Sequence, residues 1–209
     1  RSACKAEETI HIYPCLDDWT TSTAIEPIYF YQDCWAFEKI ATAKPSNHID
    51  IGSHHKYVAL LSKVIPITMV DIRPLSLPLD TLRFVEGTIL ELPFEDSSVL
   101  SLSSLCVIEH IGLGRYGDPL DPEGSSKACK ELKRVMAPGG SLYLSIPVEA
   151  KPATYFNAHR SFSEADFLAY FHEFEMKDSA YIYGSEFVSE LRDEFGVGCY
   201  HLIKRTGHC

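Results

Sequence analysis

The sequence predicts an α/β fold: a single-domain, doubly wound Rossmann-like sheet that is mostly parallel, with an antiparallel strand at its C-terminal end. Short apolar runs alternate with segments of helical periodicity, which is the pattern of parallel strands joined by helices. The run from Ile67 to Ile72 is apolar and β-branched, as in strands that are buried on both faces. The 209 residues suit one domain, with residues 1–25 as an N-terminal arm and residues 26–209 as the domain.

Each element follows from its local pattern. Residues 26–44 are predicted as a helix, because apolar residues recur near helical spacing, Pro27 suits a first turn and Pro45 ends the helix. A helix at 56–64 lies between the first two of four strands, which are predicted at 49–51, 67–72, 82–85 and 99–105. The helix at 123–136 is stopped by the turn at 138–140, and a fifth strand follows at 141–146. A helix from Ser163 to about Phe174 precedes strands at 176–183 and 198–204, which flank a helical connection.

Composition excludes several classes of function. The formal net charge is −10, and no basic stripe is present to bind a nucleic-acid backbone. Seven cysteines without CxxC spacing argue against a structural zinc site and fit reduced thiols, so we predict no metal site and a cytoplasmic protein. No apolar run reaches membrane-spanning length, and we expect membrane association only if an anchor upstream of Arg1 has been removed. The sequence carries no signal for an oligomeric state.

Residues after the predicted strands indicate a nucleotide-type cofactor. Ligands of open α/β sheets bind beyond the carboxyl ends of the strands. Gly52 follows the first strand and can adopt a positive φ, which lets the backbone approach a ligand closely. Asp71 closes the second strand about twenty residues after Asp50, where a carboxylate accepts both hydroxyls of a ribose. Ile89 and Leu92 follow the third strand, where an adenine ring can lie.

The order of these motifs resembles that of class I S-adenosylmethionine-dependent methyltransferases. The resemblance rests on Asp50-Ile51-Gly52, Asp71, Leu92-Pro93-Phe94, Val107-Ile108-Glu109-His110 and the run Leu132 to Gly140. Within that superfamily, the runs His110 to Pro122 and Phe156 to Arg160 resemble a little-characterised family of unknown function. The resemblance implies that its members are encoded beside surface-glycan genes.

The resemblance implies S-adenosylmethionine as the cofactor and assigns a role to each matching position. Asp50, Gly52 and Ser53 would face its methionine portion, Asp71 its ribose, Ile72, Thr88 and Ile89 its adenine, and Leu105 and Cys106 the wall near its sulfonium. Two positions depart from the superfamily pattern. His54 stands where a second glycine is usual, and the alternatives are weak cofactor affinity or a contact from His54 itself to the cofactor carboxylate, while Thr88 stands where an acidic residue is usual.

The loops after the fourth and fifth strands carry the candidates for catalysis and substrate binding. A hydroxyl acceptor needs a base, for which we favour His159 or His110. Arg115 and Arg160 are candidates for an anionic group of the substrate. The full substrate-binding set is Glu109, Arg115, Asp118, Asp121, Asn157 and Arg160. The alternative is structural, since Glu109 and His110 can brace the strand end, and aspartate is common in proline turns.

These observations favour a methyltransferase that acts on a small-molecule or glycan hydroxyl. A catalytically inactive binding protein with the methyltransferase fold is the first alternative, because of His54 and Thr88. A nicotinamide-dependent oxidoreductase is the second, since Asp71 would serve its ribose equally well. The G-x-G-x-x-G fingerprint of that class is interrupted at His54 and Tyr57, which counts against it.

Overall fold

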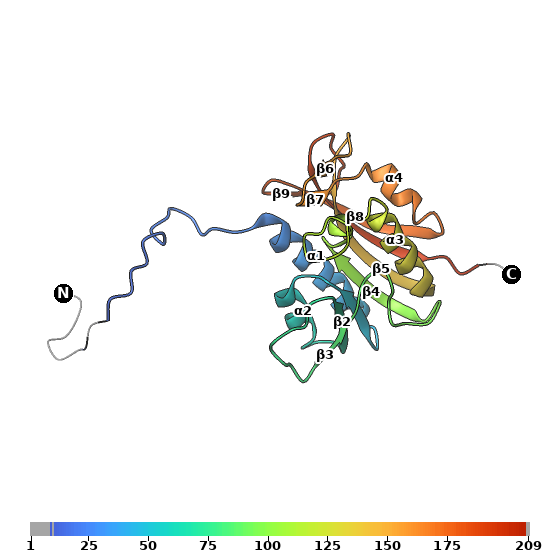
Figure 1. The fold of residues 1–209 in the computed structure, drawn as a ribbon, viewed down its shortest axis with the longest axis horizontal. Helices are drawn as coiled ribbons and strands as arrows, with labels where there is room; N and C mark the ends of the chain where they lie inside the picture. Colours follow the sequence, from blue (N-terminus) through green and yellow to red (C-terminus); the bar gives the residue numbers. More distant parts are fainter. Residues whose placement is uncertain (1–8, 10, 208–209) are drawn as a thin grey trace.

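One mixed sheet forms the centre of the molecule in this computed structural model, which describes residue 9 and residues 11–207 (Figure 1). Its strands are β1 (His48–Ile51), β2 (Ile67–Asp71), β3 (Leu82–Glu86), β4 (Val99–Leu105), β5 (Met136–Val148), β8 (Phe174–Tyr183), β9 (Glu186–Val188) and β10 (Gly196–Lys204). Their order is β3-β2-β1-β4-β5-β10-β8-β9. The first five strands are parallel to their neighbours, whereas β10 is antiparallel to β5 and β8, and β9 is antiparallel to β8. The predicted fold class is confirmed.

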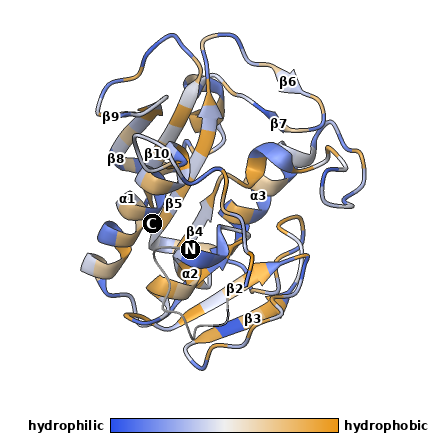
Figure 2. Cartoon of the chain, turned by 90° about the vertical axis from the view of Figure 1, so that its left-hand side faces the viewer, coloured by the Kyte–Doolittle hydropathy of each residue, from blue (hydrophilic) through white to orange (hydrophobic). Residues whose placement is uncertain are grey.

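Helices cover both faces of the sheet, as a doubly wound fold requires. Helices α1 (Pro27–Ala43) and α2 (His55–Leu61) pack on one face, and α3 (Gly124–Val135) and α4 (Glu164–Ala169) pack on the other. Side chains of one strand point alternately to the two faces, so Tyr143 of β5 joins the core under α1 and α2, while Leu142 and Leu144 join the core under α3 and α4. Figure 2 shows the apolar residues along these strands and the inner sides of the helices. In the described part of the chain, no helix is long and apolar enough to cross a membrane.

The boundaries of α1 follow from its capping residues. The Glu26 side chain accepts a hydrogen bond of 2.7 Å from the Tyr29 amide, and Pro27 takes the first helical position. Lys44 ends the helix with a φ of +50°, its amide donating to Ile40 O, and Pro45 follows. The predicted helix at 26–44 is therefore confirmed to within one residue at each end.

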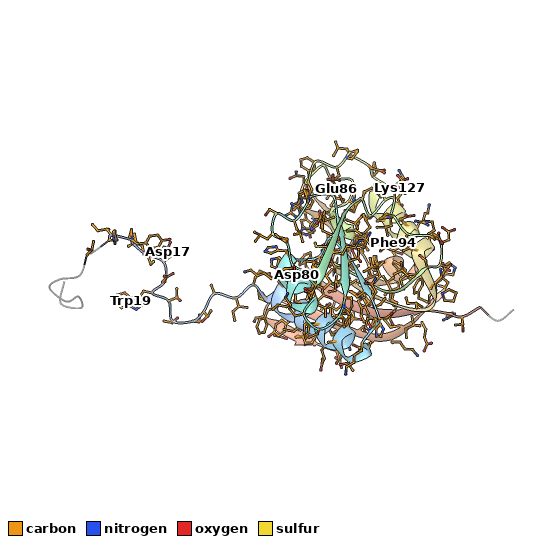
Figure 3. All side chains as sticks on the ribbon, turned by 90° about the horizontal axis from the view of Figure 1, so that it is seen from below. Asp17, Trp19, Asp80, Glu86, Phe94 and Lys127 are labelled. Carbon is orange, nitrogen blue, oxygen red and sulfur yellow. The ribbon has the colours of Figure 1, made fainter. Side chains whose placement is uncertain are left out.

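The N-terminal segment before α1 differs from the rest of the chain. Residues 11–26 contain no helix or strand and extend away from the sheet and its helices, as Figures 1 and 3 show. Asp17 and Trp19, which are labelled in Figure 3, lie on this arm, and the Trp19 side chain is 99% exposed.

Five features differ from the prediction. Strand β5 begins at Met136, directly after α3, so the Pro138-Gly139-Gly140 segment is a bulge within the strand: two steps along β4 oppose five along β5. Helix α4 ends at Ala169, before the predicted end near Phe174. The predicted helical connection after β8 is wrong, because Gly184 turns the chain at a φ of +55° and β9 pairs back onto β8. A short hairpin, β6 (Thr154–Tyr155) with β7 (His159–Arg160), and a 3-10 turn, η1 (Ile108–His110), were not predicted.

Candidate active site

The loops after β1, β2 and β4 meet at the carboxyl edge of the sheet, with Gly52 at their centre. Gly52 has a φ of +64°, a conformation that glycine adopts without strain. A Cβ atom at this position would lie 3.3 Å from the Val107 side chain and 3.9 Å from Asp71 Oδ2. The structure therefore brings the ends of the three strands together, as the sequence predicted.

Asp50 and Ser53 hold the Gly52 loop in this position. Asp50 is fully buried, and its carboxylate accepts hydrogen bonds from the Ser53 amide (3.1 Å) and the Ser103 hydroxyl (2.6 Å). Burial raises the pKa of Asp50 to about 6, although these hydrogen bonds oppose the shift. The Ser53 hydroxyl in turn accepts from the Leu105 amide at 3.1 Å, which ties β1 to β4. Both side chains are therefore buried and fix the conformation of the Gly52 loop through hydrogen bonds inside the fold.

His54 occupies the position of the missing second glycine. It precedes the first residue of α2 and makes no side-chain capping hydrogen bond. Its ring lies 4.9 Å from the Tyr29 ring and 4.4 Å from the His55 ring, between centroids. Partial burial, followed by the charges of His55 and Lys56, lowers the pKa of His54. The imidazole is thus neutral near pH 7, and it lies beside the Gly52 loop at the carboxyl edge of the sheet.

Asp71 presents an open carboxylate oxygen at the end of β2. Its Oδ1 accepts from the Arg73 amide at 2.8 Å, which fixes the side chain, and its Oδ2 faces Gly52. Among the described residues, Oδ2 has no hydrogen-bond partner, and the side chain is 13% exposed. The next residue, Ile72, is 39% exposed and offers an apolar surface beside the carboxylate.

The segment after β3 is more buried than the predicted adenine contacts require. Ile89 and Leu92 are each 4% exposed and belong to the core under α3 and α4. The Thr88 hydroxyl accepts a hydrogen bond from the Leu90 amide at 3.2 Å, which closes a turn. Of the apolar residues predicted beside the adenine, Ile72 is therefore the one with an exposed face.

The end of β4 places a carboxyl group in the interior. Leu105 is buried, and Cys106 follows with a φ of +52° and a thiol that donates to Gln32 Oε1 at 3.2 Å. Glu109 is 1% exposed, and its Oε2 is buried without a hydrogen-bond partner in the described residues. Burial raises the pKa of Glu109 to about 8, so its carboxyl group is mainly protonated at pH 7.

The two candidate bases differ in their contacts. The Nδ1 atom of His110 donates to Ala158 O at 2.7 Å, and burial lowers the pKa of His110 to about 4. The Nε2 atom of His159 is buried and has no partner among the described residues, and its ring clusters with those of Tyr155 and Phe195, at centroid separations of 4.8 and 5.7 Å. Burial, followed by the charge of Arg115, lowers the pKa of His159. Both imidazoles are therefore neutral at pH 7, and His159 has a ring nitrogen without a partner.

Three of the predicted substrate residues hold the loop between β4 and α3. The Asp118 carboxylate accepts from the amides of Gly112 (2.7 Å) and Tyr116 (3.2 Å). Asp121 accepts from the Glu123 amide at 2.9 Å and pairs with a lysine at 2.6 Å. The Arg160 guanidinium donates to Ile111 O and Asp121 O in this loop and to Ser125 Oγ at the start of α3. These polar groups are engaged in shaping the loop.

Of the remaining predicted substrate residues, Glu109 is buried, as described above, and two lie at the surface. Arg115 is exposed and donates one hydrogen bond of 2.9 Å to Ala158 O, which leaves other N–H groups free for a ligand. Asn157 is exposed in the turn of the β6–β7 hairpin. Both therefore lie on the outer side of the pair of histidines.

The structure adds two residues of α1 that the sequence did not single out. Gln32 is fully buried, and its Oε1 accepts from the Cys106 thiol and from Ser145 Oγ at 2.7 Å. Tyr29 contacts His54, and burial together with the nearby Cys106 and Glu109 raises the pKa of its hydroxyl. Their spacing of three residues was the available signal, since it places both on one face of a helix.

The candidate site is an open edge, and two surface hollows lie elsewhere. One of about 390 Å³ is lined by residues 75–79 with Leu82 and Phe84, and one of about 680 Å³ lies at the amino ends of β2 and β3, near Thr68 and Arg83. Among the described residues, no group of three His, Cys, Asp or Glu side chains is placed to hold a metal ion. The candidate site therefore consists of the polar groups at the carboxyl edge of the sheet.

Comparisons with known proteins agree with this fold. A family model described as "Caenorhabditis protein of unknown function, DUF268" matches residues 96–194, which include β4, the loop after it and the β6–β7 hairpin. No curated protein matches the chain.

Solved structures share the fold at low sequence identity. The N-methyltransferase NodS from Bradyrhizobium japonicum, in complex with S-adenosylhomocysteine, has a TM-score of 0.60 at 14% identity and covers 85% of this chain and 88% of its own. The 1,6-didemethyltoxoflavin-N1-methyltransferase of Burkholderia thailandensis, also with S-adenosylhomocysteine, has a TM-score of 0.57 at 15% identity and covers 90% and 94%. The cyclase SpnF has a TM-score of 0.59 at 13% identity and covers 83% and 82%. The DUF268 model therefore matches residues 96–194 of this chain, and the chain has a methyltransferase-like Rossmann fold.

Proposed function

We propose that this protein is an S-adenosylmethionine-dependent methyltransferase that acts on a hydroxyl group of a small molecule or a glycan. The observation that carries the proposal is the open Oδ2 of Asp71, which faces the positive-φ loop at Gly52. On the same edge, Glu109 and His159 each have a buried polar atom without a partner in the described residues. Unpartnered buried polar atoms are rare in folded proteins and gather at functional sites.

The residues present fit the proposed cofactor. Asp71 would hold the ribose hydroxyls, because its carboxylate is fixed at one oxygen and open at the other. Ile72 would lie against the adenine, and Gly52, supported by Asp50 and Ser53, would let the backbone approach the methionine portion. Once bound, this cofactor supplies an electrophilic methyl group on a sulfonium.

We assign the proton-accepting step to the histidines, with His159 ahead of His110. A base must be neutral and have a free ring nitrogen, and His159 meets both conditions through its Nε2. His110 donates through its Nδ1 to Ala158 O, which orients the ring and leaves its Nε2 unprotonated, so His110 is the second candidate base. Arg115 would bind an anionic group of the acceptor, and Asn157 would contact its outer part.

The surroundings of His159 support a ring-shaped acceptor. Tyr155, Phe156 and Phe195 are 42%, 84% and 43% exposed, and two of these rings contact His159. Exposed aromatic faces bind the apolar faces of flat or cyclic molecules. Asp118, Asp121 and Arg160 would contribute to acceptor binding by fixing the loop that carries Arg115.

Calorimetric titration of the purified chain with S-adenosylmethionine, S-adenosylhomocysteine and a nicotinamide dinucleotide tests the cofactor. The proposal predicts binding of both adenosyl ligands and no heat with the dinucleotide. A panel of hydroxyl-bearing acceptors with labelled methyl donor then tests turnover. Absence of binding by either adenosyl ligand contradicts the proposal, and binding of the dinucleotide alone supports an oxidoreductase.

A second candidate function is a binding protein that has lost turnover. The observation in its favour is His54, whose ring lies against Tyr29 at the position where the superfamily has a glycine. This alternative predicts that both adenosyl ligands bind and that no acceptor in the panel is methylated. Replacement of His54 by glycine then separates the two: it raises affinity if the imidazole obstructs the loop, and lowers it if the imidazole contacts the cofactor carboxylate.

A further inference from the structure

Glu109 is a buried acid that the fold does not pair. Its Oε1 lies 3.7 Å from His110 Nε2, beyond hydrogen-bond distance, and its Oε2 has no partner in the described residues. An ionised carboxylate is unstable in such a place, because burial removes its hydration, and the Glu109 backbone, the Cys106 thiol and the charge of Arg115 offset that loss only in part. The free protein therefore holds this carboxyl group in its neutral form, in agreement with the raised pKa of about 8.

The groups that face Glu109 come from several elements and leave its charge uncompensated. Cys106 at the end of β4 and Tyr29 of α1 are neutral at pH 7, since burial raises the pKa of each. His110 is neutral as well, because burial lowers its pKa to about 4, and His159 of β7 lies beyond it with a lowered pKa. The cation on this side is Arg115, which is exposed to solvent and donates to Ala158 O. Solvent screens a charge placed in this way.

Resting on the proposed function, we infer that Glu109 distinguishes the cationic methyl donor from its neutral demethylated product. The carboxyl group gives its proton to solvent when a sulfonium binds at the carboxyl edge, because a nearby positive charge favours the ionised form. The product carries a neutral thioether sulfur and gives no such stabilisation. Glu109 would thus favour binding of the donor and release of the product.

The protons balance over one turnover. Binding of the donor releases one proton from Glu109 to solvent. Transfer then breaks the carbon–sulfur bond and forms the carbon–oxygen bond of the methylated acceptor, and the acceptor hydroxyl loses its proton. With the positive charge gone, the Glu109 carboxylate takes up that proton from His159 and returns to its neutral state. The carboxylate is therefore available as a proton acceptor only while the methyl donor is bound.

The pH dependence has a definite sign. Below pH 8 the free protein must lose a proton from Glu109 before the favourable charge pair forms, so donor affinity rises with pH and levels off above about pH 8. The affinity for the neutral product has no such dependence on Glu109. The ratio of the two affinities therefore increases between pH 6 and pH 8.

Calorimetry tests this inference on the whole chain. S-adenosylmethionine and S-adenosylhomocysteine are titrated at pH 7 in two buffers of different ionisation enthalpy, which gives the number of protons released. We expect about 0.9 more protons released by wild type than by Glu109→Gln on binding the donor, and a donor Kd that tightens roughly tenfold per pH unit from 6 to 8 in wild type alone. Ionisation of the ligand's own amine is common to both proteins and cancels in the difference.

Glu38→Gln serves as the matched control, because Glu38 is exposed on α1 and the same change there should reproduce the wild-type proton count. Equal proton release by wild type and Glu109→Gln, with both ligands bound, overturns the inference and leaves the proposed function intact. If neither ligand binds to wild type, the proposed function fails and the inference with it. Infrared difference spectra of wild type give a readout without a variant: the band of a protonated carboxyl group should disappear with the donor and persist with the product, and its persistence with both overturns the inference.

Discussion

The replacement Asp71→Asn tests the proposed ribose contact with little change to the fold. The asparagine oxygen can keep the 2.8 Å hydrogen bond from the Arg73 amide, so the turn after β2 is retained. Its amide nitrogen then takes the place of Oδ2 and presents a donor where the carboxylate presented an acceptor. Loss of one charge-assisted hydrogen bond costs about 1.5–3 kcal/mol, which corresponds to a roughly 10- to 150-fold weaker Kd for both adenosyl ligands.

The assay is calorimetric titration at constant pH and ionic strength, with thermal unfolding measured in parallel. The ion pair between Asp71 and Arg73 is 3.7 Å long and largely exposed on the arginine side, so we expect the free energy of unfolding to change by less than about 1 kcal/mol. Asp80→Asn is the matched control, because Asp80 is an exposed aspartate at the amino end of β3. An unchanged Kd for both adenosyl ligands in Asp71→Asn, or an equal loss of affinity in Asp80→Asn, would show that Asp71 does not bind the ribose.

Three further predictions concern stability and catalysis. Arg160→Met removes donors to two oxygens of the loop before α3 and to Ser125 Oγ at the start of α3, and should destabilise the fold by about 2–4 kcal/mol, seen as a melting temperature lower by roughly 5–15 °C. His48 is buried and neutral, and burial lowers its pKa to about 3, so the unfolded chain binds a proton below pH 6.5 that the folded chain does not. The free energy of unfolding should therefore decrease as the pH is lowered from 6.5 to 3, by at most about 1.4 kcal/mol per pH unit. Urea titrations of His48→Gln should show a weaker dependence of the free energy of unfolding on pH. His159→Gln should lower turnover of a hydroxyl acceptor roughly 100-fold or more at unchanged donor affinity, and the acid limb of wild-type kcat/KM should lie below pH 6.5.

Each of these three has a result that counts against it. A melting temperature of Arg160→Met within about 1 °C of wild type would show that the guanidinium does not hold the loop. The same pH slope in wild type and His48→Gln would place the titration elsewhere. Normal turnover by His159→Gln would move the proton-accepting role to another group, with His110→Gln as the next variant.

The sequence predicted the strands and helices whose pattern is local. Strands β1 to β4 and helices α1 to α3 follow from apolar periodicity and end at proline, glycine or capping residues, which act within a few positions. Strand β9 depends on its pairing with β8, and the early start of β5 depends on a bulge against β4. These features are set by contacts between elements, so the periodicity of one segment does not reveal them.

The candidate site divides in the same way. Gly52 and Asp71 were predicted because Gly52 directly follows β1 and Asp71 is the last residue of β2, and the parallel sheet brings these strand ends together. The hydrogen bonds of Arg160 reach oxygens that lie 35 to 49 positions away in the sequence, and those of Gln32 span up to 113 positions. The type of residue predicted that Arg160 binds an oxygen, and only the fold shows that the oxygens belong to the protein's own loop.

The most direct test of the central claim is a structure of the protein with S-adenosylhomocysteine bound. We predict that the ribose hydroxyls contact Asp71 Oδ2, that the backbone at Gly52 lies against the homocysteine portion, and that the sulfur faces the side of the edge formed by Glu109 and His159. A ligand bound elsewhere, or a ribose without contact to Asp71, would contradict this prediction.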